Sequence, residues 1–372
     1  MTTHHASSDY TLLDSAEPLR AAAGGWSAEG WLAVDTEFVR DDSYYPEPCL
    51  IQVGDGRQAC CIDTIVLDAS ALQPLFATLA STTITKVFHS ASQDLELFVQ
   101  LTGDCPRPLF DTQLAASLLG EGDQLGYAGL VERRLGIKLD KSLTRTDWSR
   151  RPLSAAELAY AAADVRHLAE LYPQLREELA TAGRLTWLEE DCARLSDPRR
   201  YRNPPEEAWR RLKGIARLEA SAQRVAAELA GWRETVAQER NRPRKWILED
   251  EPLYRMAERQ PQSEQQLVDL QMLSPKTLSR HGSALLEVIA RARHGTHPIA
   301  VEEPPLIDSQ KARLQKLQEQ LRQRAASLNV PPSLLAPRAD LEALVRRGAE
   351  AGAPVLEGWR REVVGMELVK LL

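Results

Sequence analysis

Long uncharged apolar runs are absent from this sequence of 372 residues. A helix that crosses a membrane needs about 18–20 consecutive apolar residues, so the sequence predicts no membrane span. The first ten residues are polar and lack the apolar core of a secretory signal peptide. We therefore expect a cytoplasmic protein without a membrane partner.

Cysteine is scarce, and no Cys-x-x-Cys pair of the kind that binds zinc occurs. The number of cysteines is odd, and several lie in or beside apolar segments, which favours buried free thiols in a reducing compartment. The five cysteines are Cys49, Cys60, Cys61, Cys105 and Cys192.

A net positive charge, common in nucleic-acid-binding proteins, is also missing, because the formal net charge is -7. The average hides an asymmetry: residues 1–195 carry a net charge of -13 and residues 196–372 a net charge of +6. An acidic half suited to cations, joined to a basic half suited to phosphates, favours a metal-dependent nuclease over a small-molecule enzyme. The alternative is a solvated surface whose charge varies along the chain without a functional reason.

Apolar periodicity predicts both strands and helices in the first half of the chain. Three antiparallel strands are expected at residues 31–38, 49–53 and 58–62, and a fourth strand at residues 84–88. The predicted helices are 12–23, 67–79, 113–119, 125–135 and 155–179. Ser90 or Ser92 is expected to cap the helix that follows the fourth strand.

Two carboxylates, Asp35 and Glu37, lie near the end of the first predicted strand. Side chains alternate along a strand, so both should project from one face while Thr36 points to the other. Neighbouring acids repel each other unless a cation lies between them. A solvated strand end is the alternative explanation, so the assignment depends on acids elsewhere in the chain.

Further acids occur at Asp94, expected in a first helical turn, and at Asp164. Tyr160 precedes Asp164 by four residues, so the two should share one face of a helix. Asp111 is better explained as a helix N-cap or as an acid at the end of a strand than as a ligand.

Four clustered carboxylates without basic partners would repel strongly if partly buried. Oxygen ligands of this kind favour two Mg²⁺ or Mn²⁺ ions, the arrangement that supports in-line displacement at phosphorus. Tyr160 is positioned to orient the attacking water.

The sequence Asp35-Thr36-Glu37, the segment from His89 to Leu95 with Asp94, and Tyr160-x-x-x-Asp164 resemble the three motifs of the DEDDy 3′→5′ exonucleases. Their order and surroundings, over residues 10–194, are most similar to the ribonuclease D family. The resemblance implies an α/β RNase H-like domain with a mixed central sheet flanked by helices. It also implies that Asp35, Glu37, Asp94 and Asp164 bind metal and that Tyr160 orients water.

The basic half resembles the helical HRDC domain from residue 205 to residue 295, although Gln271-Met272-Leu273 stands where many relatives have a glycine. Residues 308–372 resemble a second, divergent all-α HRDC domain. We therefore predict an exonuclease domain at 1–195 and HRDC domains at 196–298 and 299–372, with a linker at about 299–308.

Candidate substrate-binding residues lie close to the motifs or in basic clusters. Gln52 and His89 are candidates for contacting the terminal nucleotide, although His89 is equally explained as a capping or packing residue. Arg242, Arg244 and Lys245 are candidate contacts to RNA phosphates, and the same holds for the cluster between Arg199 and Lys213. Solvated basic faces are the alternative for both clusters.

The resulting prediction is a monomeric 3′→5′ exoribonuclease that trims tRNA precursors and other structured RNAs with single-stranded 3′ tails. It would release nucleoside 5′-monophosphates. Two alternatives stay open at this stage: a 3′→5′ DNA exonuclease, because the motifs do not distinguish the sugar, and a catalytically dead nucleic-acid-binding scaffold.

Overall fold

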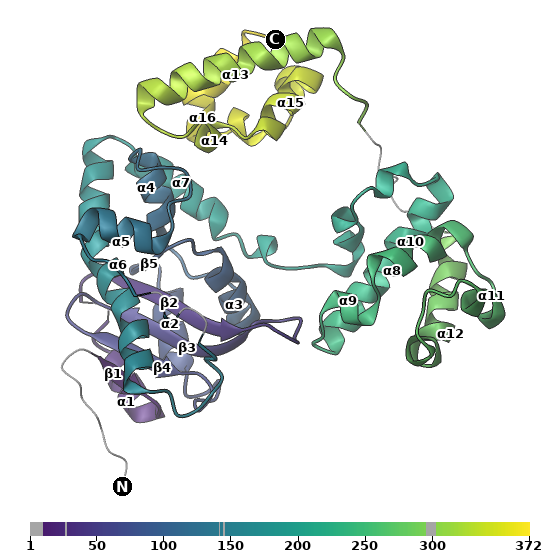
Figure 1. The fold of residues 1–372 in the computed structure, drawn as a ribbon. Helices are drawn as coiled ribbons and strands as arrows, with labels where there is room; N and C mark the ends of the chain where they lie inside the picture. Colours follow the sequence, from purple (N-terminus) through teal and green to yellow (C-terminus); the bar gives the residue numbers. More distant parts are fainter. Residues whose placement is uncertain (1–9, 27, 141, 144–145, 295–302) are drawn as a thin grey trace. The chain divides into compact units, whose positions relative to one another are not determined.

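The computed structural model of the chain describes residues 10–26, 28–140, 142–143, 146–294 and 303–372 (Figure 1). The chain divides into two compact units. Unit 1 contains Met1–Val39, Pro48–Arg199 and Leu306–Leu372, and unit 2 contains Arg40–Glu47 and Arg200–Pro305. The C-terminal residues therefore group with the predicted exonuclease domain, and residues 299–302 of the predicted linker lie outside the described part.

Unit 1 is built on a six-stranded sheet with the order β1-β4-β3-β2-β5-β6. β3 (Glu47–Gly54) pairs antiparallel with β4 (Ala59–Asp63), as the predicted meander requires. β2 (Trp31–Val39), β5 (Thr85–Phe88) and β6 (Leu109–Asp111) continue the sheet through parallel pairs. The sheet is therefore mixed, as predicted.

Helix α6 (Ala155–Thr181) lies across one face of this sheet and packs on β2 and β4 (Figure 1). The helix starts with a capping box in which the Ser154 hydroxyl accepts a hydrogen bond from the Glu157 amide and the Glu157 carboxylate accepts one from the Ser154 amide. The alanines of α6 allow the helix to approach the sheet closely, and Gly54 of β3 allows the same from the side of the sheet. A Cβ at Gly54 would lie 3.0 Å from the Val165 carbonyl oxygen.

Other helices complete unit 1 around this core: α1 (Ala16–Ala23), α2 (Gln73–Ala80), α3 (Ser92–Thr102), α4 (Thr112–Leu118), α5 (Tyr127–Leu135) and α7 (Leu185–Leu195). The predicted helix at 125–135 is confirmed, and Gly136 ends it with a φ of 70°.

The helix predicted from Leu12 was wrong in its first turn. Residues Thr11–Leu13 form strand β1, which pairs in parallel with Cys60–Ile62 of β4. This pairing partner lies far away in sequence, so local periodicity did not reveal it. The helix begins only at Ala16, after the Ser15 N-cap.

The helix predicted from Leu67 also starts late, because α2 begins at Gln73. Pro74 lies in its first turn, where its ring is tolerated and the missing amide hydrogen is not needed. The preceding residues form turns, in which the Asp68 carboxylate accepts a hydrogen bond from the Ala71 amide at 2.8 Å.

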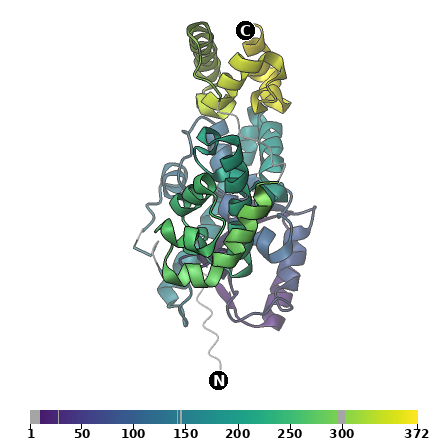
Figure 2. The same ribbon diagram turned by 90° about the vertical axis from the view of Figure 1, so that its right-hand side faces the viewer.

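Unit 2 contains helices from Pro205 to Ala292, seen from a second direction in Figure 2. Its main helices are α8 (Ala220–Glu239), α9 (Arg244–Ile247), α10 (Asp250–Arg259), α11 (Glu264–Asp269) and α12 (Pro275–Ala292). A core that includes Val225, Leu229, Leu253 and Leu285 holds them together. After α11, Gln271 adopts a φ of 53°, a conformation that glycine reaches most easily.

The C-terminal residues of unit 1 form α13 (Asp308–Leu328), α14 (Pro332–Leu335), α15 (Arg338–Arg347), α16 (Gly358–Arg360) and α17 (Met366–Val369). They dock on α7 through Trp359, whose ring stacks on Trp187 at 4.6 Å between centroids. Beside it, the Arg360 guanidinium donates to both oxygens of the buried Asp191 carboxylate, at 2.5 and 2.9 Å. A stacked aromatic pair and a bidentate ion pair therefore join these helices to the exonuclease part.

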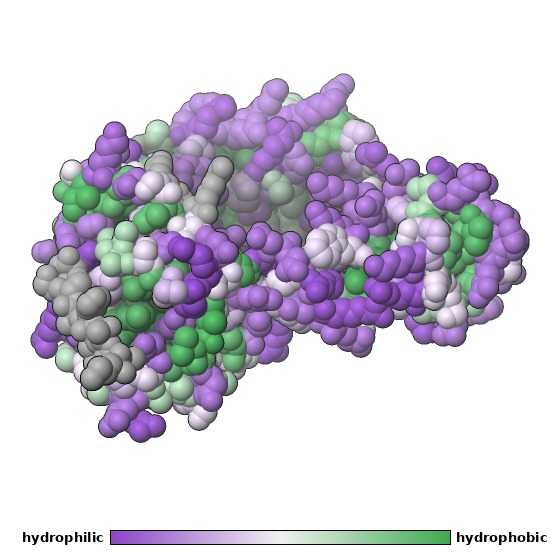
Figure 3. Space-filling model, turned by 60° about the horizontal axis from the view of Figure 1, so that its bottom comes forward, coloured by the Kyte–Doolittle hydropathy of each residue, from purple (hydrophilic) through white to green (hydrophobic). Residues whose placement is uncertain are grey.

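All five cysteines are free and buried, which confirms that prediction. None of the helices in the described residues combines the length and apolar character needed to cross a bilayer. On the face shown in Figure 3, hydrophilic residues predominate and apolar residues appear in scattered groups.

Candidate active site

Strand β2 and helix α6 bring three carboxylates together. On β2, Ala33 packs in the core against α6, so Asp35 and Glu37 point toward the same helix. Asp164 projects from α6, and one oxygen from each of the three carboxylates lies within 4.8 Å of the others. Within the described residues, this group is the one whose geometry suits a metal ion.

Asp94 is buried in the first turn of α3, as predicted, but it lies outside that three-carboxylate group. The Thr36 hydroxyl donates a hydrogen bond of 2.5 Å to its Oδ1. Burial, followed by the charge of Asp35, raises the pKa of Asp94, so this carboxyl lies near the group. The role of Asp94 as a metal ligand stays a prediction.

The three clustered carboxyls resist ionisation in the absence of a cation. Burial, followed by the charges of Asp35, Asp164 and Asp94, raises the pKa of Glu37 to about 9. Burial also raises the pKa of Asp164, with Asp35 as the second cause, and burial raises the pKa of Asp35. Among the described residues, no Lys or Arg side chain forms an ion pair with these three acids, so a cation fits the charge that the site lacks.

Tyr160 lies one helical turn before Asp164, and its ring stacks on Trp148 at 6.3 Å between centroids. Burial, followed by the charges of Asp164 and Glu37, raises the pKa of Tyr160 to about 12. The phenol is therefore protonated at neutral pH and is able to donate a hydrogen bond.

Tyr127 is a residue of this site that the sequence analysis missed. Its hydroxyl donates a 2.5 Å hydrogen bond to the backbone carbonyl of Asp164, and its ring lies 5.3 Å from that of His89. Burial, followed by the Asp164 charge, raises the pKa of the Tyr127 phenol. No motif marks this contact, because the two residues are 37 positions apart.

The imidazole of His89 forms a hydrogen bond with the hydroxyl of Thr112. The Thr112 hydroxyl donates to the Phe88 carbonyl at 3.1 Å, so it accepts from His89 Nδ1 at 3.0 Å. This arrangement favours the neutral tautomer that leaves Nε2 as an acceptor, and burial lowers the pKa of His89. His89 therefore has a packing role at the edge of the site, and its contact with nucleotide stays a prediction.

Gln52 is fully buried on β3. It pairs with Cys61, whose thiol donates to the Leu158 carbonyl of α6 at 3.6 Å, so Gln52 also faces that helix. Its amide has no hydrogen-bond partner among the described residues. This placement beneath α6 does not favour the predicted contact with nucleotide, because no part of the side chain is exposed.

Asp111 is the N-cap of α4, as predicted, and accepts hydrogen bonds from the Gln113 and Leu114 amides at 2.8 and 3.2 Å. It also accepts from the backbone amides of Ser90 and Ala91. The predicted Ser90 or Ser92 cap of α3 was wrong, since the N-cap is Ala91 and no side chain caps that helix.

Two of the three basic residues between positions 242 and 245 that were predicted to contact RNA have protein partners in unit 2. Arg244 donates to the buried Glu234 carboxylate at 2.5 Å and to the Tyr44 hydroxyl at 2.8 Å. Arg242 pairs with Asp42 at 2.7 Å. Lys245 is exposed.

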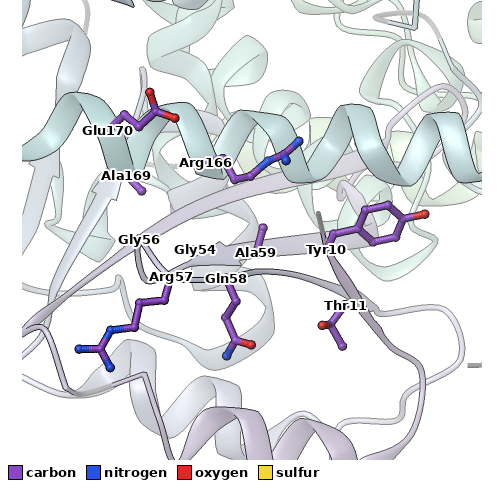
Figure 4. Close-up of a pocket in the computed structure, with 10 residues that line it drawn as sticks. All are labelled: Tyr10, Thr11, Gly54, Gly56, Arg57, Gln58, Ala59, Arg166, Ala169 and Glu170. Carbon is purple, nitrogen blue, oxygen red and sulfur yellow. The ribbon is translucent and has the colours of Figure 1, made fainter. Parts of the chain in front are cut away.

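A cavity of about 290 Å³ lies elsewhere in unit 1, between α6 and the β3–β4 turn (Figure 4). Arg166, Ala169 and Glu170 line it from the helix, and Arg57 and Gln58 line it from the turn. None of the five predicted catalytic residues lines it. The carboxylate group, rather than this cavity, is therefore the candidate active site.

Comparison with known proteins shows which family the chain belongs to. A 3′-5′ exonuclease family model matches residues 10–180, and an HRDC domain model matches residues 222–289. The chain is 40% identical over 374 residues to ribonuclease D of Zymomonas mobilis, across 98% of this chain and 94% of that protein. The chain belongs to the ribonuclease D family.

This ribonuclease D family member is a 3′→5′ exoribonuclease, which confirms the predicted activity. Ribonuclease D of Sphingobium indicum is 40% identical over 353 residues, covering 92% of this chain and 89% of that protein. The crystal structure of Escherichia coli RNase D, at 30% identity, superimposes with a TM-score of 0.87 over 98% of both chains. The RNase H-like exonuclease domain and one HRDC domain are thereby confirmed.

Proposed function

We propose that the chain trims the 3′ ends of tRNA precursors and other small structured RNAs and releases nucleoside 5′-monophosphates. The observation that carries the proposal is the group of Asp35, Glu37 and Asp164, whose oxygens lie within 4.8 Å of one another beside Tyr160. The E. coli relative is described as an exoribonuclease involved in structured RNA processing.

The cofactors in this proposal are two Mg²⁺ or Mn²⁺ ions. Carboxylate oxygens are the ligands these hard cations prefer, and the raised pKa of Glu37 indicates a site that needs added positive charge. Asp35, Glu37 and Asp164 would hold the ions together with Asp94. Bound there, the ions would activate a water molecule and stabilise the leaving 3′-oxygen.

The protein's own residues orient the reactants. Tyr160 keeps its proton, so its hydroxyl can donate to the attacking water or to a phosphate oxygen. Tyr127 holds the backbone of Asp164, and Thr36 holds the Asp94 carboxylate. Asp164 and Asp94 are thereby held in place before substrate binds.

RNA recognition in this proposal extends to the helical parts of the chain. Residues 299–372, which contain α13 to α17, are proposed to be a second, divergent HRDC domain. We further propose a monomer in the cytoplasm, where five free thiols would stay reduced. Substrate choice would depend on the shape of the RNA and on its single-stranded 3′ tail.

The test is Asp35→Asn in the full chain, assayed with Mg²⁺ on a structured RNA that has a single-stranded 3′ tail. We expect hydrolysis to be lost and RNA binding to be kept, because one metal-binding charge is removed without a change of volume. Asp68→Asn is the matched control, since Asp68 is an exposed acid of the same unit. Undiminished hydrolysis by Asp35→Asn would refute the metal-binding role.

A second comparison tests the substrate. RNA and DNA oligomers with the same 3′ tail are given to the wild-type chain, and the rates of 5′-monophosphate release are measured. We expect faster release from RNA. Preferential degradation of DNA would overturn the proposed substrate.

A further inference from the structure

Trp246 differs from the other tryptophans in its exposure. The chain has eight tryptophans, all of them in the described residues, and Trp246 is the most exposed of them, with 56% of its surface accessible. It lies in α9 of unit 2, directly after Lys245. Exposure of an indole to water is unfavourable in free energy, so the position of Trp246 outside the core requires an explanation.

The backbone that carries Trp246 is firmly anchored. On one face of α9, Ile247 is buried and Arg244 donates to the carboxylate of Glu234. The Arg244 guanidinium also lies over the Tyr44 ring, 4.7 Å from its centroid. Residues 245 and 246 fall between these inward positions, so they project outward from a fixed helical turn.

A cation already lies against the indole ring. The Arg242 guanidinium carbon is 5.9 Å from the ring centroid of Trp246, while the same guanidinium pairs with Asp42 at 2.7 Å. The ring is therefore held by a cation–π contact and still presents more than half of its surface to solvent. Lys245 is exposed next to it, and no ion pair of this ammonium occurs among the described residues.

We propose that Trp246 and Lys245 form a binding position for single-stranded RNA, in which a nucleobase stacks on the indole and a neighbouring phosphate meets the ammonium. The inference rests on the proposed function, because it presupposes an RNA substrate. Every base has a π-face, so an aromatic platform binds single strands without sequence preference. The exposed acids Glu249 and Glu251 lie close to Trp246 in the sequence, and their carboxylates would repel phosphates. Base stacking should therefore contribute more to binding here than an extended run of phosphate contacts.

The first test measures binding of the full chain to a fluorescein-labelled single-stranded oligoribonucleotide in EDTA, where hydrolysis does not occur. Loss of a stacked base should weaken binding of Trp246→Ala by about five-fold or more. Trp246→Phe keeps an aromatic face and should bind within about two-fold of wild type, whereas Trp246→Leu should resemble Trp246→Ala. Val268→Ala is the matched control, because Val268 is an apolar side chain of unit 2 that is 48% exposed.

The second test separates stacking from charge by varying the salt concentration. Lys245→Ala should reduce the slope of log Kd against log salt by about 0.7, the value for one phosphate contact on a single strand. Trp246→Ala should leave that slope unchanged. The control Val268→Ala should hydrolyse RNA at the wild-type rate, since Val268 belongs neither to the carboxylate site nor to the proposed binding position.

Wild-type affinity in Trp246→Ala, with RNA hydrolysis intact in the wild-type chain, would overturn this inference and leave the proposed function standing. Absence of RNA hydrolysis by the wild-type chain would instead overturn the proposed function. Equal weakening by Trp246→Ala and Val268→Ala would also count against the stacked base, because it would show a general effect of apolar surface.

Discussion

The Tyr44 hydroxyl donates a hydrogen bond to the Glu234 carboxylate across 190 positions of the chain. Arg244 donates to both groups, and the Asn241 side chain accepts from the Tyr44 and Tyr45 amides at 3.0 Å. Tyr44 lies between β2 and β3, in the segment 40–47 that belongs to unit 2. The segment that directly follows the strand of Asp35 and Glu37 is thus fastened to the helices of unit 2.

Tyr44→Phe should destabilise this attachment. Hydrogen bonds to charged groups contribute about 1.5–3 kcal/mol, and Glu234 keeps Arg244 as a partner, so we expect a loss of about 1.5 kcal/mol. Urea unfolding of the full chain, followed by circular dichroism, measures the change. Tyr45→Phe is the control and should change stability by less than about 0.5 kcal/mol. Equal effects of both substitutions would show that the hydroxyl of Tyr44 has no special role.

Thr36→Val should impair metal binding through Asp94. The substitution keeps the shape of the side chain but removes the hydroxyl that donates to Asp94. Without that donor, the pKa of Asp94 should rise further, because the hydrogen bond favours the ionised form. We expect the Mg²⁺ concentration for half-maximal hydrolysis to rise several-fold in Thr36→Val and to stay near wild type in Thr36→Ser. An unchanged Mg²⁺ dependence in Thr36→Val would show that the Thr36 hydroxyl does not support metal binding through Asp94.

Tyr160→Phe should slow the chemical step. A hydrogen bond of about 1.5–3 kcal/mol that acts in the transition state corresponds to about a 10- to 150-fold lower kcat. The Mg²⁺ dependence should stay the same, since the phenol is not a metal ligand. Single-turnover hydrolysis of a short RNA gives the rate, and Tyr254→Phe in unit 2 is the control. A full wild-type rate in Tyr160→Phe would contradict the proposed orientation of water.

The metal-free chain should lose stability as the pH rises. The pKa of Glu37 is about 9 in the folded chain and near 4.5 in the unfolded chain. Between these values the folded state holds a proton that the unfolded state has released, so stability falls with increasing pH, by at most about 1.4 kcal/mol per pH unit for one proton. Thermal unfolding in EDTA from pH 5 to pH 9 measures the slope.

Glu37→Gln provides the control for this pH dependence. The amide does not titrate, so the slope in EDTA should become shallower. Saturating Mg²⁺ should also flatten the wild-type curve, because a bound cation keeps the carboxylates ionised. A wild-type slope that is the same in EDTA and in Mg²⁺ would show that metal and protons do not compete at Glu37.

Much of the site was predictable from the sequence because its chemistry is local. Strand alternation placed Asp35 and Glu37 on one face, and helical spacing placed Tyr160 beside Asp164. Asp94 was correctly expected in a first helical turn, and Asp111 was correctly expected to cap a helix. Each of these depends on neighbours within a few residues, where backbone geometry alone sets direction.

The contacts that join distant segments were not predictable in this way. Thr36 meets Asp94 over 58 positions, and Arg244 has Tyr44 and Glu234 as partners, although its sequence neighbourhood suggested a phosphate contact. Residues Thr11–Leu13 form strand β1 because they pair in parallel with β4. In each case the deciding group comes from a remote part of the chain.

By itself, the sequence determined which residues are candidates for the chemistry and which family the chain resembles, because motif spacing and helix and strand periods are local properties. Only the tertiary structure decided that three carboxylates meet, that Asp94 is held by Thr36, and that Arg244 is paired while Trp246 is exposed. Those outcomes depend on burial and on contacts between distant segments, and both arise only when the chain is folded. Burial raises the pKa values of the carboxyl groups, and the long-range contacts pair guanidinium groups with carboxylates.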